Sequence, residues 1–196
     1  MAENKVRFGL KNVYYAVLTE GDDNTNNSWA TPVAVKGAVS LTLDSNGTDG
    51  TFYADNVAYY KTFANNGYTG TLEMARIPDS MYTDVWGMTV DGTSKVLYET
   101  TGVQPKAFAL LFQIEGDEAA ELNVFYRVVP TSKPSVGSQT VEEQVEPVTQ
   151  SFDFDALPLV TGPSYQNGFI KGRTTDTTTT AVRSAWFSGV TIATTA

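Results

Sequence analysis

The 196-residue chain contains no cysteine and no histidine. Without cysteine it has no disulfide framework, no thiolate metal site and no cysteine nucleophile. Without histidine it has no imidazole base, no Ser-His-Asp triad and no ordinary zinc site. These absences remove most of the side-chain chemistry of enzymes and metal centres, so we expect a protein that is not an enzyme and that uses no metal or other cofactor.

Long hydrophobic runs and clusters of basic residues are also missing. The longest apolar run, residues 107–112, is far shorter than the roughly 20 residues of a membrane-spanning helix. The first residues lack the apolar segment of a signal peptide. The 13 Lys and Arg residues are scattered among 22 Asp and Glu residues, giving a formal net charge of −9. Because tight nucleic-acid binding needs clustered cations, we expect neither a membrane segment nor specific DNA binding.

Threonine, valine, tyrosine and phenylalanine are abundant, and clusters of Gly, Asn and Asp interrupt them at short intervals. This pattern is typical of an antiparallel β-sandwich or barrel. Alternation of apolar and polar residues predicts strands at residues 13–17, 38–43, 68–77, 108–114, 122–129 and 152–155. The very apolar 108–114 segment is predicted to be central and to pair with 122–129. In 152–155 the two aromatic rings face one side and the two carboxylates face the other.

Two short helices are predicted, at residues 78–86 and 178–187, the first opened by Pro78-Asp79 and ended by Gly87. Residues 20–30, 44–50 and 130–147 are predicted to be loops. The last is long for a structureless connection, and such loops are usually functional or part of an assembly. We expect residues 1–196 to form one domain, with an N-terminal arm at 1–10, an assembly loop at 130–147 and a C-terminal helix at 178–187.

Patterns that suggest chemistry are weak. Asp153 and Asp155 share a strand face, where a catalytic pair is conceivable but a solvated polar surface is the favoured interpretation. Residues 44–55 loosely resemble a calcium loop, but they lack its Gly at the sixth position and its Glu at the twelfth. In the pairs Tyr14-Tyr15 and Tyr59-Tyr60 we expect one ring in the core and the other on a surface or interface, with sugar stacking as the alternative.

An ordered series of segments carries a more specific signal. It opens with Val6-Arg-Phe-Gly-Leu-Lys-Asn-Val-Tyr-Tyr-Ala-Val17 and continues through residues 32–41, 52–56, 66–73, 77–79, 106–112, 133–135, 146–147 and 173–177. Taken in this order, over nearly the whole chain, these segments resemble the major tail proteins of long-tailed siphophages that infect Gram-positive bacteria. No single segment is catalytic, and the order of the series is what makes the resemblance specific.

The resemblance implies a tail tube subunit: a β-sandwich flanked by a helix that forms hexameric rings. The rings stack into a tube around a tape-measure protein, between a tail terminator and tail tip proteins, and DNA later passes through without specific binding. It also implies a location in the virion tail after assembly in the host cytoplasm. Some relatives carry an extra C-terminal immunoglobulin-like domain, which this chain is not expected to have.

The acidic composition has a use in such a tube. Six copies at −9 each give 6 × −9 = −54 per ring, and lumen carboxylates would repel DNA and reduce sticking. Candidates for lining the lumen are Glu73, Glu115, Asp117, Asp153 and Asp155. Contacts between subunits or rings are expected at residues 1–7, 44–56 and 130–147, with Lys5, Arg7, Asp44, Asp49, Tyr53, Asp55, Lys133, Glu142, Glu143 and Glu146 as candidates.

Two other classes of function stay open. One is a non-catalytic β-sandwich binding module for carbohydrate or a cell surface, which would act as a free monomer. The other is an enzyme with paired carboxylates, such as a glycosidase. That enzyme would need a cleft holding two carboxyl groups about 5–10 Å apart.

Overall fold

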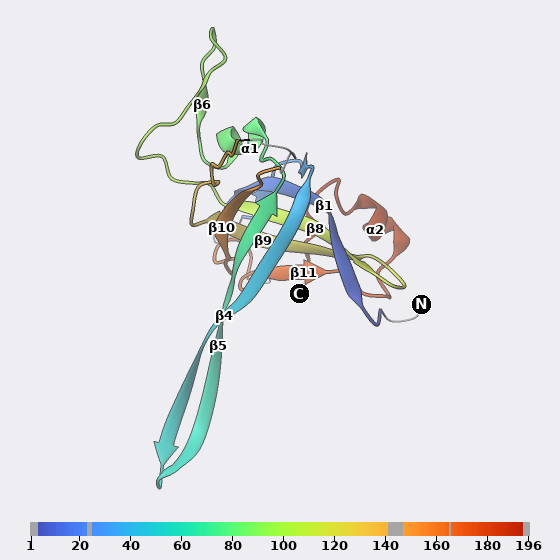
Figure 1. The fold of residues 1–196 in the computed structure, drawn as a ribbon. Coiled ribbons are helices and arrows are strands. Elements are labelled where there is room, and N and C mark those ends of the chain that lie inside the picture. The colour runs from blue at the N-terminus through green and yellow to red at the C-terminus, as the bar shows by residue number, and fades with distance from the viewer. Residues whose placement is uncertain (1–3, 23–24, 141–146, 165, 194–196) are drawn as a thin grey trace.

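A computed structural model describes residues 4–22, 25–140, 147–164 and 166–193 (Figure 1). The described elements are strands and two short helices. In chain order they are β1 (Arg7–Thr19), β2 (Ser28–Trp29), β3 (Val33–Val35), β4 (Ala38–Ala54), β5 (Val57–Met74), α1 (Asp79–Asp84), β6 (Thr89–Val90), β7 (Leu97–Tyr98), β8 (Phe108–Gly116), β9 (Glu121–Pro130), β10 (Gln150–Ala156), β11 (Lys171–Arg173) and α2 (Thr180–Ala185).

One nine-stranded sheet organises the described part of the chain. Its order is β2-β1-β8-β9-β10-β5-β4, with β3 paired to β1 and β11 paired to β9, and the pairings are antiparallel. The prediction of a mainly β, antiparallel fold with short helices is confirmed. The sheet is open, with β4 at one edge, so it does not close into a barrel. Strands β6 and β7 form a separate two-stranded sheet.

Strand β8 is central because both of its faces are buried. Phe108, Leu110 and Phe112 point into one hydrophobic core, whereas Ala109 and Leu111 point into a second core on the other side of the sheet. Successive side chains of a strand alternate between faces, so a continuous apolar run suits a strand covered on both sides. The predicted pairing with β9 is confirmed, and Gln113 lies opposite Leu122.

The two helices cover opposite faces of the sheet. Helix α1 adds Met81 to the first core and leads into Val85 and Trp86 in the same core, and α2 leads into Trp186 in the second. Both helices are shorter than predicted. Helix α2 is capped by Thr179, whose hydroxyl accepts a hydrogen bond from the backbone of Val182.

The longest strands, β4 and β5, pair beyond the body of the sheet and form a projecting ribbon, called the arm here (residues 45–66; Figure 1). The prediction of a loop at residues 44–50 is therefore wrong, because these residues continue β4. At the tip, Asp55 and Asn56 have φ angles of 51° and 59°. Positive φ at both central residues is the conformation of a two-residue turn whose twist matches that of the strands it joins.

A second projection, residues 87–105, carries the small β6–β7 sheet and extends from the body in the direction opposite to the arm (Figure 1). The expected N-terminal arm is corrected as well. Residues 7–10 belong to β1, where Arg7 pairs with Gly116 and Phe8 with Glu115. No helix among the described residues is long and apolar enough to cross a membrane.

Candidate functional site

The body of the sheet carries an acidic face where β4, β5 and β10 lie side by side. The register places Ser40 opposite Glu73, and Glu73 opposite Ser151 on the other side. The next two rows are Thr42, Thr71 and Asp153, then Asp44, Thr69 and Asp155. The intervening residues of the same strands, Leu72, Phe152 and Phe154 among them, are buried in the first core. One face of these strands is therefore apolar, and the opposite face holds hydroxyls and four carboxylates.

Hydroxyl groups hold two of these carboxylates in place. Glu73 accepts hydrogen bonds from Thr149 at 2.5 Å and from Ser40 at 2.8 Å. The hydrogen bond from Thr149, followed by that from Ser40, holds the pKa of Glu73 below its usual value, so its charged form is favoured. Asp153 accepts a hydrogen bond of 2.6 Å from Thr71 on the neighbouring strand. The hydroxyl groups of Thr149 and Ser40 thus favour the ionised form of Glu73 without a cation.

No Lys or Arg neutralises this face within the described ranges. The ion pairs found there do not include Asp44, Glu73, Asp153 or Asp155. A hollow of about 190 Å³ lies over the rows that contain Thr42, Thr71 and Asp153. The face can therefore present an open negative surface that repels phosphate.

The structure brings together only some of the predicted lumen residues. Glu73, Asp153 and Asp155 share the acidic face, and Asp44, predicted as a contact residue, joins them. Glu115 and Asp117 lie elsewhere, toward the turn between β8 and β9. Glu115 pairs with Lys11 at 2.7 Å, and Asp117 accepts a hydrogen bond of 2.9 Å from the backbone of Lys5. These two carboxylates already bind the first residues of the chain.

A single cation between Asp44 and Asp55 is ruled out by the fold. Both residues belong to the extended β4 segment and its turn, eleven residues apart. At about 3.3 Å per residue, they are separated by roughly 36 Å. In the part of the chain that the structure describes, no group of three acidic side chains is placed to hold a metal ion.

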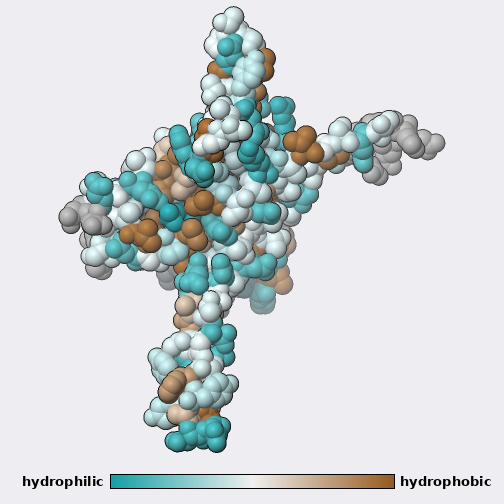
Figure 2. Space-filling model, turned by 90° about the vertical axis from the view of Figure 1, so that its left-hand side faces the viewer, coloured by the Kyte–Doolittle hydropathy of each residue, from teal (hydrophilic) through white to brown (hydrophobic). Residues whose placement is uncertain are grey.

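The arm is the second unusual surface. Every residue from 45 to 66 is exposed except Ala54, which is half-buried. Six of these residues are large and hydrophobic, with exposures from 58% to 72%: Phe52, Tyr53, Val57, Tyr59, Tyr60 and Phe63. Figure 2 shows hydrophobic groups along the arm below the body, with a polar tip. A soluble monomer rarely leaves so many aromatic side chains together in water, and such surfaces mark interaction sites.

Both faces of the arm carry aromatic side chains. Phe52 lies directly opposite Tyr60, so these two rings share one face. Alternation along β5 then places Phe63 on the other face, and Tyr59 lies at an irregularity where the register shifts. A ribbon with exposed aromatic rings on both sides is suited to lie between neighbouring subunits, because one contact would cover only one face.

The tyrosine prediction is confirmed for one pair and wrong for the other. Tyr15 is buried in the first core, and Tyr14 stacks on Phe187 with ring centroids 4.7 Å apart. Tyr59 and Tyr60 are 72% and 62% exposed, so neither ring enters the core. The difference arises because β5 continues past the sheet body at this point, and no core lies beneath it.

The other predicted contact residues have varied surroundings. Asp49, Tyr53 and Asp55 lie on the arm, and Asp49 pairs with Lys61 at 3.2 Å. Lys133 forms an ion pair with Glu99 of the second projection. Glu142, Glu143 and Glu146 lie outside the described residues.

Arg7 joins a cluster that the sequence analysis missed. It pairs with Glu121 at 2.9 Å, and Arg173 pairs with the same carboxylate oxygen at 3.3 Å. Glu121 is only 9% exposed, so both cations neutralise a carboxylate held largely away from water. Strands β1 and β11 supply the two cations. Because these strands are distant in sequence, no local sequence pattern indicates that the two arginines lie together.

Comparison with known proteins gives no family for this chain. No family model matches the sequence, and no curated protein matches it at a significant level. The acidic face and the arm therefore carry the functional argument.

Proposed function

We propose that this protein is a structural subunit of a siphophage tail tube, which self-assembles into stacked hexameric rings through which DNA passes. The observation that carries the proposal is the arm: an ordered ribbon with aromatic side chains on both faces and no core of its own. Such a ribbon is best explained by burial between other copies of the same chain. Its partners in this role would be further copies, the tape-measure protein, and the terminator and tip proteins of the tail.

The direction of the two projections supports a stack. The arm leaves one end of the body and residues 87–105 leave the opposite end (Figure 1). The second projection also exposes hydrophobic side chains, including Val90, Val96 and Tyr98. Contacts that join one end of a subunit to the opposite end of the next are head-to-tail, and they extend without limit unless rotation closes them into a ring.

The acidic face supports a role as a channel wall. Four carboxylates lie on it without a cationic partner among the described ion pairs. In a narrow bore the wall lies within one or two Debye lengths of the duplex, about 8 Å each at physiological salt, so screening is incomplete. A wall of this kind would repel the phosphate backbone and let DNA move without sticking.

A glycan-binding module is the second candidate function, because exposed Tyr53, Tyr59 and Tyr60 would suit stacking on sugar rings. The two functions differ in the state of the protein. A binding module acts as a monomer, whereas a tube subunit polymerises as its concentration rises.

Electron microscopy of purified protein over a range of concentrations tests the proposal. We expect rings or hollow tubes from the wild-type chain. The matched control replaces residues 48–64 by Asn-Gly, since Gly47 and Asn65 are paired in register and Asn-Gly closes a two-residue hairpin. This variant should fold and stay monomeric. A wild-type chain that remains monomeric up to its solubility limit, and that binds glycans, would contradict the proposal.

A further inference from the structure

A surface hollow lies at the end of β5 that is farthest from the arm tip. It has a volume of about 470 Å³ and is lined by Ala34, Lys36, Arg76, Pro78 and Asp79. Arg76 and Pro78 lie between β5 and α1, and Asp79 begins α1. Val57 begins β5 next to the tip, and Met74 ends it beside the hollow. At about 3.3 Å per residue, these ends are roughly 55 Å apart, so the arm cannot fold back onto this hollow of its own chain.

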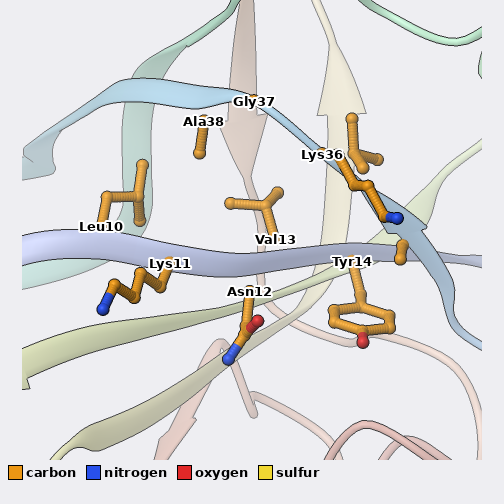
Figure 3. A pocket seen from close by; sticks show the side chains of 10 residues that line it. Leu10, Lys11, Asn12, Val13, Tyr14, Lys36, Gly37 and Ala38 are labelled. Carbon is orange, nitrogen blue, oxygen red and sulfur yellow. The ribbon is translucent and has the colours of Figure 1, made fainter.

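A second hollow continues the first around β3. It has a volume of about 350 Å³, and Ala34 and Lys36 line both. In Figure 3, Leu10, Val13 and Ala38 point into the space between β1 and the link from β3 to β4, while Lys11, Asn12 and Tyr14 point to the other side of β1. The joined hollows therefore combine an apolar floor with a cationic rim.

The rim is unusual in so acidic a chain. Lys36 is exposed and makes no ion pair with any described residue. The side chain of Arg76 is 78% exposed, and it forms a long ion pair of 3.5 Å with Asp79. With two cations and one carboxylate, the rim carries a net charge of +1 in a protein whose formal charge is −9.

The arm tip has the complementary chemistry. Asp55 occupies the turn, and it forms no ion pair with the residues the structure describes. Tyr53 and Tyr60, on the two strands that lead to this turn, are 67% and 62% exposed. A carboxylate near exposed aromatic residues suits a site that offers two cations beside apolar groups, since Arg and Lys also interact favourably with ring faces.

We propose that the hollow between β3 and the start of α1 receives the arm tip of a second copy of this chain, with Asp55 facing Lys36 and Arg76. The inference rests on the proposed function and names the acceptor of its central contact. Because donor and acceptor lie at opposite ends of β5, each copy offers one tip and one free hollow. The contact is therefore head-to-tail and sets one polarity for the whole stack.

Cross-linking through introduced thiols tests the contact directly. The chain has no cysteine, so a short bis-maleimide will join only the cysteines placed in it. The double variant Asp55→Cys/Lys36→Cys, assembled and then cross-linked, should give a ladder of dimers, trimers and longer chains. Each single variant should give no ladder. The control Asp55→Cys/Asp176→Cys, with its second thiol on an exposed turn before α2, should also give none.

Charge exchange supplies a second measurement. Asp55→Lys and Lys36→Glu should each raise the concentration needed for assembly at least tenfold, and the combined variant should recover most of the loss. Lysine is compatible with the turn, because Lys95 adopts a φ of 58° in this chain. The neutral variant Asp55→Asn should show a smaller effect than Asp55→Lys.

The possible outcomes separate the two proposals. Wild-type tubes without the Asp55–Lys36 cross-link, or without rescue in the combined variant, overturn this acceptor and leave the tube function standing. Dimers from Asp55→Cys alone indicate tip-to-tip pairing and also overturn it. A wild-type chain that never assembles contradicts both proposals.

Discussion

Replacing a single aromatic residue of the arm should weaken assembly strongly and folding hardly at all. We take Phe52→Ser as the perturbation. Phe52 is 62% exposed, and a phenylalanine offers about 200 Å² of surface, so about 120 Å² remains to be buried by a neighbour. At about 25 cal/mol per Å² this is about 3 kcal/mol, or about 1.5 kcal/mol if the neighbour covers half of it. Since 1.4 kcal/mol is a factor of about ten, the critical concentration for assembly should rise ten- to a hundredfold.

The folded monomer should lose much less stability. Phe52 lies opposite Tyr60 across the ribbon, and a cross-strand aromatic pair contributes about 0.2–1 kcal/mol. Phe125→Ala is the contrasting variant, because Phe125 is completely buried and its loss should cost about 3–5 kcal/mol of unfolding free energy. Sedimentation of polymer gives the critical concentration, and urea unfolding gives stability. An unchanged critical concentration for Phe52→Ser, or a stability loss as large as that of Phe125→Ala, would refute the reasoning.

Further predictions concern charge and ionisation. Glu121→Gln should lower the unfolding free energy by about 1–3 kcal/mol in urea titrations, because two arginines lose their buried counter-charge; an unchanged midpoint would contradict this. Burial raises the pKa of both Tyr15 and Tyr126 to about 12. The folded state thus keeps protons that the unfolded state releases near pH 10. The free energy of unfolding should therefore fall as pH rises from 10 to 12. The ultraviolet absorbance of tyrosinate measures the ionisation of the two side chains over this range. Asp153→Lys should slow DNA ejection from particles with intact tubes, whereas Glu115→Lys should affect it less; equal rates for both would contradict the placement of the acidic face.

Much of the sheet body could be predicted from the sequence because burial leaves a periodic trace. The alternation in 152–155 correctly places Phe152 and Phe154 in the core and Asp153 and Asp155 on the opposite face. The unbroken apolar run of β8 correctly indicates a central strand. In both segments the side-chain pattern and the final environment follow from the same two-residue period.

The arm could not be predicted in this way, since no core selects its side chains. The segment Asp44-Ser-Asn-Gly-Thr-Asp-Gly50 has the composition of a turn, and only its pairing with β5 makes it a strand. Backbone hydrogen bonds between the two strands do not depend on side-chain type, so the sequence carries little trace of them. The prediction for Tyr59 and Tyr60 is wrong for the same reason. Aromatic rings usually pack into a core, but no core lies beneath this part of β5.

The separation of the arm from the two cores also indicates which part of the chain is needed for folding. The two hydrophobic cores draw none of their buried residues from positions 45–66, so the body can fold without help from the arm. A two-stranded ribbon alone is at best marginally stable in water. Its order would then be completed by whatever covers its exposed aromatic side chains. If the proposed assembly holds, the sheet body folds on its own, and the ribbon mediates association and gains its full stability only between neighbouring subunits.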